Sequence, residues 1–482
     1  MKKSTVLLSL TVALSGLYQA KPQGMVIQPG TCVKIESGTT LDLTAGDLTL
    51  QSASTGDASL IDLGSVTYSG GGQARVQRYL TQGKWHLISS PVASAVSGMF
   101  VNDYLQYFTE SVNSWTDIPP VITPLNVMQG YAVWTTNGAP ATEVFSGTTN
   151  TGTKSRNFTQ NSQGWNLLGN PYPSAIDWDA VTIPAALNGA FWLFDPATGV
   201  NGEYKYYIKD GGAANTTTQY IPSGQGFFVR ATGGSGTLNL TNASRVHSNQ
   251  SFYKAGENPS ALIIKATGNN ITTQTAIRFI PEATAAFDQL FDVSKLTAYS
   301  PDVPVVYTRV QGEMTAINSL PSVQGNETVP VYFTAGLDGT YFLTAEGCLD
   351  IDPSVPVFLE DVSMHTFQDL RVNPEYQFMY AAGQEKEFRI HFKEATGIDT
   401  PNVPAVDCFL NNRVLHVNFP PDNTEMGFSG ASLSVYNVTG QLIHRQQVTD
   451  YVNRIPFDAV ESIYLVSITT HRSRISVKVF NH

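Results

Sequence analysis

The sequence predicts an all-β, multidomain protein: a β-sandwich or jelly-roll-like body followed by a small C-terminal immunoglobulin-like β-sandwich. Its 482 residues suffice for three or four domains. The 40 glycines and 11% aromatic residues favour strands and turns over helices. Short runs of β-branched and aromatic residues recur between turn residues, which is typical of small antiparallel sheets.

Residues 1–20 are typical of a secretory signal peptide. Lys2 and Lys3 precede a short apolar core, and small residues follow as far as Ala20. The apolar run is too short to span a membrane. We therefore expect an exported protein. The net charge is −11 and no basic patch is interleaved with aromatics, so nucleic acid is not an expected partner.

Residues 21–83 are predicted to form an N-terminal β region. The phrase TLDLTAGDLTL places Leu41, Leu43, Leu48 and Leu50 on one face, on either side of an Ala-Gly-Asp turn. The phrase ARVQRYL indicates another strand. The phrase YSGGGQ before it indicates a glycine turn, because no phosphate-loop residues follow it.

Residues 84–250 contain an internal repeat of two copies. The phrase WHLISSPV at 85–92 returns as WNLLGNPY at 165–172, and QGYAV at 129–133 returns as QGFFV at 225–229. Two copies are too few for a solenoid, so we expect two related β-units or two halves of one sandwich. The tryptophan that opens each copy is expected to start a strand and lie in the core.

Copy two carries residues that copy one lacks. Asp177, Trp178 and Asp179 align with Ser, Gly and Met in copy one. Two carboxylates in an extended loop can hold a structural calcium ion, although such a pair is also a common turn signal. The repeated phrases lie 80 and 96 positions apart, so copy two also has an insertion, which is most easily placed within residues 195–220. Aromatic side chains around this insertion can stack on a polysaccharide or can fill a core: Trp178, Tyr204, Tyr206 and Tyr207.

Residues 251–395 are predicted to form a second β-sandwich domain. Eight short β-branched or aromatic runs, from ALIIKATG to EFRIHF, follow one another at roughly regular spacing. The phrase FDQLFDVSKL at 287–296 has apolar residues near helical spacing, and is the best helix candidate in the chain.

A linker at 396–406 contains two prolines and separates the body from a compact module at 407–482. The module contains LSVYNVTGQLI and IYLVSITTHRSRISVKVF. On these phrases it resembles the type A C-terminal sorting domain of type IX secretion cargo. The matching positions are Gly440, Tyr464 and Lys478; Ser462 departs from the family, which usually has glycine there.

The resemblance implies an export route and a set of partners. Cargo of this kind crosses the outer membrane of a Gram-negative bacterium through the type IX secretion machinery. A sortase then removes the sorting domain, and the body is released or attached to surface lipopolysaccharide. We therefore expect a secreted or outer-membrane-attached, adhesin-like structural or interaction protein with a polysaccharide or protein ligand. The alternatives are a carbohydrate-binding surface protein that uses the copy-two aromatics, and a glycan hydrolase.

The sequence contains no recognised catalytic constellation. It lacks the His-Glu-x-x-His, Gly-x-Ser-x-Gly and Cys-x-x-Cys patterns, and its eight histidines are scattered. Acidic pairs occur, but any acidic chain offers them, and glycoside hydrolysis requires two carboxylates across a cleft. We expect a protein without enzymatic activity and, apart from the calcium alternative, without a cofactor.

Overall fold

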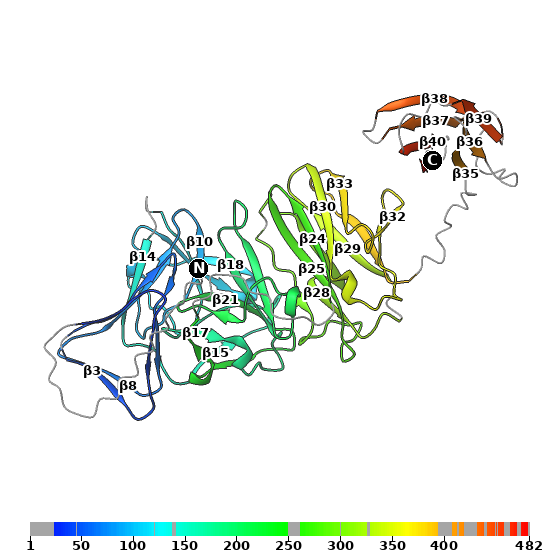
Figure 1. Ribbon diagram of the computed structural model, residues 1–482. Coiled ribbons are helices and arrows are strands. Elements are labelled where there is room, and N and C mark those ends of the chain that lie inside the picture. Colours follow the sequence, from blue (N-terminus) through cyan, green and yellow to red (C-terminus); the bar gives the residue numbers. More distant parts are fainter. Residues whose placement is uncertain are drawn as a thin grey trace, which may run out of the picture. The chain divides into compact units, whose positions relative to one another are not determined.

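The protein is all-β and divides into two compact units, Met1–Lys393 and Glu394–His482. The helical segments in the described part are short 3-10 turns, and no helix there is long and apolar enough to cross a membrane. The predicted signal peptide and the predicted linker lie outside the described residues. The computed structural model (Figure 1) describes residues 24–44, 46–119, 121–136, 141–248, 261–298, 300–324, 328–393, 407–411, 414–418, 431–437, 441–448, 450, 452–456, 463–469 and 474–480.

The N-terminal region is a short parallel coil rather than a set of hairpins. Each strand of its first turn pairs in parallel with a strand of the second turn: β1 with β4, β2 with β7 and β3 with β8, and β4 pairs in turn with β9. Figure 1 shows β3 and β8 side by side. The bounds are β1 Met25–Ile27, β2 Cys32–Ile35, β3 Thr40–Thr44, β4 Leu48–Leu50, β5 Ser52–Ala53, β6 Gly56–Asp57, β7 Ser59–Asp62, β8 Ser65–Ser69 and β9 Ala74–Leu80.

The predicted inward face of this region is confirmed, and the strands on either side of the predicted turn belong to different sheets. Leu43, Leu48 and Leu50 are buried in one core, with Leu41 packed against it. β3 pairs with β8 in one sheet, whereas β4 lies between β1 and β9 in another. Alternation of apolar residues reports which face is buried but not which strand pairs with which.

The two copies of the repeat fold into sheets of the same topology. The strand order is β10-β13-β11-β12 in copy one and β16-β21-β18-β19 in copy two. In each copy, the strand that precedes the four-stranded sheet in the sequence pairs with the strand that follows it: β9 pairs with β14, and β15 pairs with β22. The bounds are β10 Trp85–Ile88, β11 Tyr104–Thr109, β12 Ser114–Asp117, β13 Tyr131–Trp134, β14 Ala141–Gly147, β15 Lys154–Phe158, β16 Trp165–Gly169, β18 Ala190–Asp195, β19 Glu203–Ile208, β21 Gly226–Arg230 and β22 Gly236–Leu240.

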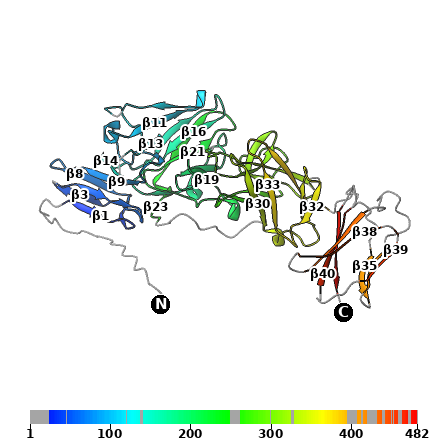
Figure 2. The ribbon, with the colours of Figure 1, turned by 90° about the horizontal axis from the view of Figure 1, so that it is seen from above.

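The predicted repeat is thus a structural duplication, and the two copies pack against each other. Leu87 and Ala132 of copy one share a core with Trp165 and Phe228 of copy two. Figure 2 shows β11 and β13 beside β16 and β21. A small sheet of β20 Tyr220–Ile221, β17 Ala175–Asp177 and β23 Arg245–Val246 completes copy two.

The region from 261 to 393 is built on one eleven-stranded sheet. The sheet curls so that its end strands approach: Gln368 Nε2 on β32 donates to Glu375 O on β33 at 2.8 Å. One buried apolar cluster fills the interior. The bounds are β24 Ala261–Gly268, β25 Ile271–Phe279, β26 Val293–Ser294, β27 Val305–Val310, β28 Glu313–Leu320, β29 Thr328–Thr334, β30 Gly339–Glu346, β31 Phe358–Asp361, β32 Thr366–Asp369, β33 Glu375–Tyr380 and β34 Lys386–His391.

The helix predicted at 287–296 does not form. Asp288 accepts a hydrogen bond from the Thr284 amide at 2.5 Å, and Asp292 accepts one from the Ser319 amide at 2.6 Å. These aspartates satisfy backbone donors outside a helix, which is how short polar side chains compete with helical hydrogen bonding. The segment forms turns that lead into β26.

The second unit is a small sandwich of two antiparallel sheets, ordered β35-β36-β39 and β38-β37-β40-β41. Tyr464 is buried in its core. Lys478 lies on β41, and Gly440 lies outside the described residues. The bounds are β35 Asp407–Asn411, β36 Val414–Asn418, β37 Ala431–Tyr436, β38 Leu442–Val448, β39 Val452–Pro456, β40 Ile463–Thr469 and β41 Arg474–Phe480.

Candidate functional site: an aromatic cleft between the two copies

A cleft of about 530 Å³ lies where the two repeat sheets meet. The segment 296–298 adds to its wall. Each copy supplies four aromatic rings to the lining, which are Trp85, Phe108, Trp115 and Trp134 from copy one and Trp165, Phe194, Tyr204 and Phe228 from copy two. The duplication thus builds the site, because neither copy alone could provide both walls.

Phe228 on β21 is the centre of the aromatic lining. Its ring contacts the rings of four others edge-on, with centroid distances of 5.2 Å to Phe108, 5.8 Å to Tyr204, 6.1 Å to Trp115 and 6.3 Å to Trp165. Phe228 is buried, whereas Trp115 is 37% exposed. The cleft therefore has a fixed apolar floor and an accessible ring on one wall.

The two walls carry equivalent aromatic pairs. Phe108 on β11 lies opposite Trp115 on β12, and Phe194 on β18 lies opposite Tyr204 on β19. Each pair is edge-to-face with ring centroids 5.3 Å apart, and the interplanar angles are 68° and 67°. Cross-strand aromatic pairs on strand hairpins hold one another in place, so both walls are preorganised.

The polar groups around the cleft are mostly neutral amides and hydroxyls. Lys84 is the one charged side chain in the described part of the lining, and its Nζ donates to Val200 O at 3.1 Å. Gln106 is held by a 2.8 Å hydrogen bond from its Nε2 to Asp117 Oδ1. Aromatic surfaces with a few polar groups at the edge suit a ligand that has apolar faces and hydroxyl-bearing edges.

The structure separates the four aromatic residues that the sequence singled out. Tyr204 lines the cleft. Trp178, Tyr206 and Tyr207 are buried, with 1%, 3% and 8% of their surfaces exposed, which favours the core-filling alternative for these three. The Trp178 indole N–H donates to Gly189 O at 2.8 Å, which satisfies its polar atom inside the core.

The predicted calcium pair makes hydrogen bonds within the protein. Asp177 Oδ1 accepts from the Asp179 amide at 3.1 Å and thereby caps a single 3-10 turn, Trp178–Ala180. Both Asp179 carboxylate oxygens lie 2.9 Å from the Tyr207 hydroxyl. Among the described residues, no group of three or more acidic, histidine or cysteine side chains could hold a metal ion. The turn interpretation therefore accounts for both aspartates.

The copy-one wall was not among the predicted site residues. Trp85, which was predicted to lie in the core, is half-buried and lines the cleft beside Trp134. Phe108 and Trp115, which lie between the two repeated phrases, belong to the same wall. The repeat itself could have indicated Phe108 and Trp115, because copy two has an aromatic pair on its middle hairpin and copy one has an equivalent hairpin.

The fold and the cleft define a class of protein: an all-β protein with an internally duplicated body. Within that class, the chain belongs to the family described as a domain of unknown function, DUF8693, whose model matches residues 5–392. No curated protein matches the chain. A solved structure titled "Biofilm associated protein - BSP domain" is similar at 8% identity, covers 84% of this chain and 92% of that chain, and has a TM-score of 0.12.

Proposed function

We propose that this chain is an exported, adhesin-like interaction protein that binds a neutral polysaccharide in the aromatic cleft. The observation that carries the proposal is the convergence of eight aromatic side chains, four from each copy, around one cleft. A pyranose ring has an apolar C–H face that packs on an aromatic ring and a polar edge that hydrogen-bonds to amides. The near absence of charge in the lining favours an uncharged sugar chain.

The test is a binding survey of the full chain against neutral polysaccharides, with the dissociation constant measured for each one that binds. Trp115→Ala removes the accessible ring of the copy-one wall. We expect it to weaken binding by about tenfold or more, as for a central aromatic contact. Tyr104→Ala is the matched control, because Tyr104 is 63% exposed in the same sheet but does not line the cleft.

Two results would overturn the proposal. One is glycan binding that Trp115→Ala leaves unchanged or that Tyr104→Ala weakens equally. The other is a survey in which no neutral polysaccharide binds while unstructured apolar peptides do, since the cleft would then be a peptide groove. Circular dichroism of each variant confirms that it retains the wild-type fold.

We also propose that the second unit directs export by the type IX route. The support is the resemblance of residues 407–482 to sorting domains, together with the signal-peptide-like N-terminus. The partners on this route are the type IX secretion machinery, its sortase and, for an attached product, surface lipopolysaccharide. Secretion or attachment to the outer membrane then places the cleft outside the cell, where polysaccharides are available.

Mass spectrometry of the protein from the cell surface and from the medium tests the export proposal. Peptides that end near 396–406, with none from the module beyond, are the expected result. A mature protein that still ends at His482 would contradict removal of a sorting domain. The binding assay does not depend on this outcome, so the two proposals can fail separately.

A further inference from the structure

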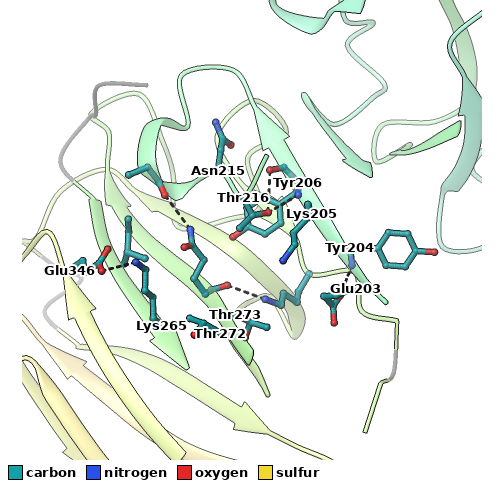
Figure 3. A pocket seen from close by; sticks show the side chains of 14 residues that line it. Glu203, Tyr204, Lys205, Tyr206, Asn215, Thr216, Lys265, Thr272, Thr273 and Glu346 are labelled. Carbon is teal, nitrogen blue, oxygen red and sulfur yellow. Dashed lines mark hydrogen bonds and ion pairs between the residues drawn. The ribbon is translucent and has the colours of Figure 1, made fainter. Parts of the chain in front are cut away.

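A second pocket, of about 310 Å³, lies beside β19 (Figure 3). Strand β19, the segment 213–216 and strands β24 and β25 form its walls. Of the residues that the structure describes, Tyr204 alone lines both spaces. Figure 3 shows the Tyr204 ring turned away from this pocket, so the two sites are separate.

The pocket differs from the cleft in its charge. Three lysines and two glutamates line it: Lys205, Lys265, Lys295, Glu203 and Glu346. Lys265 Nζ lies 2.6 Å from Glu346 Oε1, so that pair neutralises itself. Among the described residues, no carboxylate forms a contact ion pair with Lys205 or Lys295.

The second carboxylate of the pocket is already engaged. Glu203 is buried, and its Oε1 accepts a 2.7 Å hydrogen bond from the Tyr204 amide. Burial raises the pKa of Glu203, while the positive charges of Lys295 and Lys205 act to lower it. Lys295 Nζ donates to the Gln274 carbonyl at 3.0 Å, a neutral partner that leaves two of its three N–H donors available.

We infer that this pocket binds an oxyanion, such as a sulfate, phosphate or carboxylate group, between the ammonium groups of Lys205 and Lys295. Two ammonium groups at a recessed surface attract a compact anion, and partial desolvation strengthens that attraction. The neighbouring polar side chains Asn215, Thr216 and Thr272 lie in the same lining, and hydrogen bonds to Ile208, Tyr206 and Thr267 hold them in place. The anion could be free in solution or an acidic substituent on a sugar.

The charge on Lys295 makes this site sensitive to pH. Burial lowers the pKa of Lys295 to about 8. An oxyanion is bound by the protonated ammonium, so its affinity should fall as the pH rises through this value. The other charged groups that face the pocket are Glu203, Lys205 and the Lys265–Glu346 pair.

The experiment is calorimetric titration of the full chain with inorganic sulfate, inorganic phosphate and glucuronic acid at constant ionic strength. We expect saturable binding of at least one probe. Lys205→Met and Lys295→Met should each raise its dissociation constant by about tenfold or more, as expected for a charge-assisted contact. Lys209→Met is the matched control, because it removes the same charge just beyond β19, outside this pocket.

Binding of inorganic sulfate or phosphate identifies a free anion as a sufficient ligand, whereas binding of glucuronic acid alone identifies a carboxylated sugar. Both support the inference. It is overturned by the absence of saturable binding for all three probes, or by binding that Lys205→Met leaves intact or Lys209→Met weakens equally. Lys205 is only half-buried and lies on an edge strand, so we expect Lys205→Met to fold. Lys205→Met therefore tests oxyanion binding even if Lys295→Met does not fold. Glycan binding by the cleft should be the same in Lys205→Met, which separates failure here from failure of the proposed function.

Discussion

The backbone of Gln225 in copy two bridges to Ile88 in copy one. The matching residues of the other copy, Gln129 and Leu168, form the same bridge in the reverse direction. The two copies are therefore related by a local pseudo-twofold axis. Arginines repeat the relationship: Arg78 Nη2 donates to Gln225 Oε1 at 2.6 Å, and Arg156 Nη2 donates to Gln129 Oε1 at 2.8 Å.

This reciprocal contact explains the glycine that follows each glutamine. A Cβ atom on Gly130 would lie 2.4 Å from Leu168 O, and one on Gly226 would lie 2.9 Å from Ile88 O. We predict that Gly130→Ala and Gly226→Ala each lower the free energy of unfolding by about 1–3 kcal/mol, because the copies would have to separate. Urea unfolding measures the change. Gly189→Ala is the control, since its nearest neighbour would be at 3.5 Å; equal losses in all three variants would refute the explanation.

The repeat shows how far the sequence could lead. The recurring Trp-polar-Leu-aliphatic and Gln-Gly phrases indicated two related β-units, and the structure confirms both the duplication and the strands at 85–88 and 165–169. The glutamine contacts between copies could not be predicted, because they join residues 137 positions (225 − 88) and 39 positions (168 − 129) apart through backbone geometry that leaves no local pattern.

The candidate site was predicted only in part for a similar reason. Tyr204 and Tyr206 are both on β19, two residues apart. Tyr204 lines the cleft, whereas Tyr206 is buried against strands β25 and β28. Aromatic composition does not distinguish these outcomes, since burial depends on what packs against the strand. The parallel coil at the N-terminus was missed because parallel pairing joins strands through long connections, not through a recognisable turn.

Arg245 is predicted to anchor the N-terminal coil to copy two. Its guanidinium lies 2.5 Å from Asp62 Oδ1 and donates to Leu60 O at 2.7 Å, and both side chains of the ion pair are almost completely buried. Arg245→Met leaves Asp62 buried without its partner and should cost about 3–5 kcal/mol of stability. Lys34→Met, which breaks the exposed Lys34–Glu36 pair, should cost less than about 1 kcal/mol. Comparable losses in thermal or urea unfolding would show that burial does not govern the Arg245 contact.

Variants of Trp178 can distinguish a core residue from a residue that contacts the glycan. Trp178→Ala should lower the free energy of unfolding by about 3–5 kcal/mol, because it leaves a large cavity and an unsatisfied Gly189 carbonyl. Trp178→Phe keeps most of the packing and should leave glycan affinity at the wild-type value. A folded Trp178→Phe protein with a tenfold loss in glycan affinity would return Trp178 to the binding site.

The pocket beside β19 predicts a pH dependence of stability. Lys295 has a folded pKa of about 8, below its ordinary value of 10.5. Between these two pKa values the unfolded chain binds more protons than the folded protein. This lysine therefore makes the free energy of unfolding increase as the pH rises from about 8 towards 10.5. In buffers without sulfate or phosphate, the wild-type free energy of unfolding should increase more between about pH 7.5 and 9.5 than that of Lys295→Met.

Lys209→Met is the control for this measurement and should follow the wild type, because its charge is outside the pocket. Parallel curves for the wild type and Lys295→Met would mean that Lys295 is hydrated well enough to keep its ordinary proton affinity, and the pH sensitivity inferred for anion binding would be lost with it.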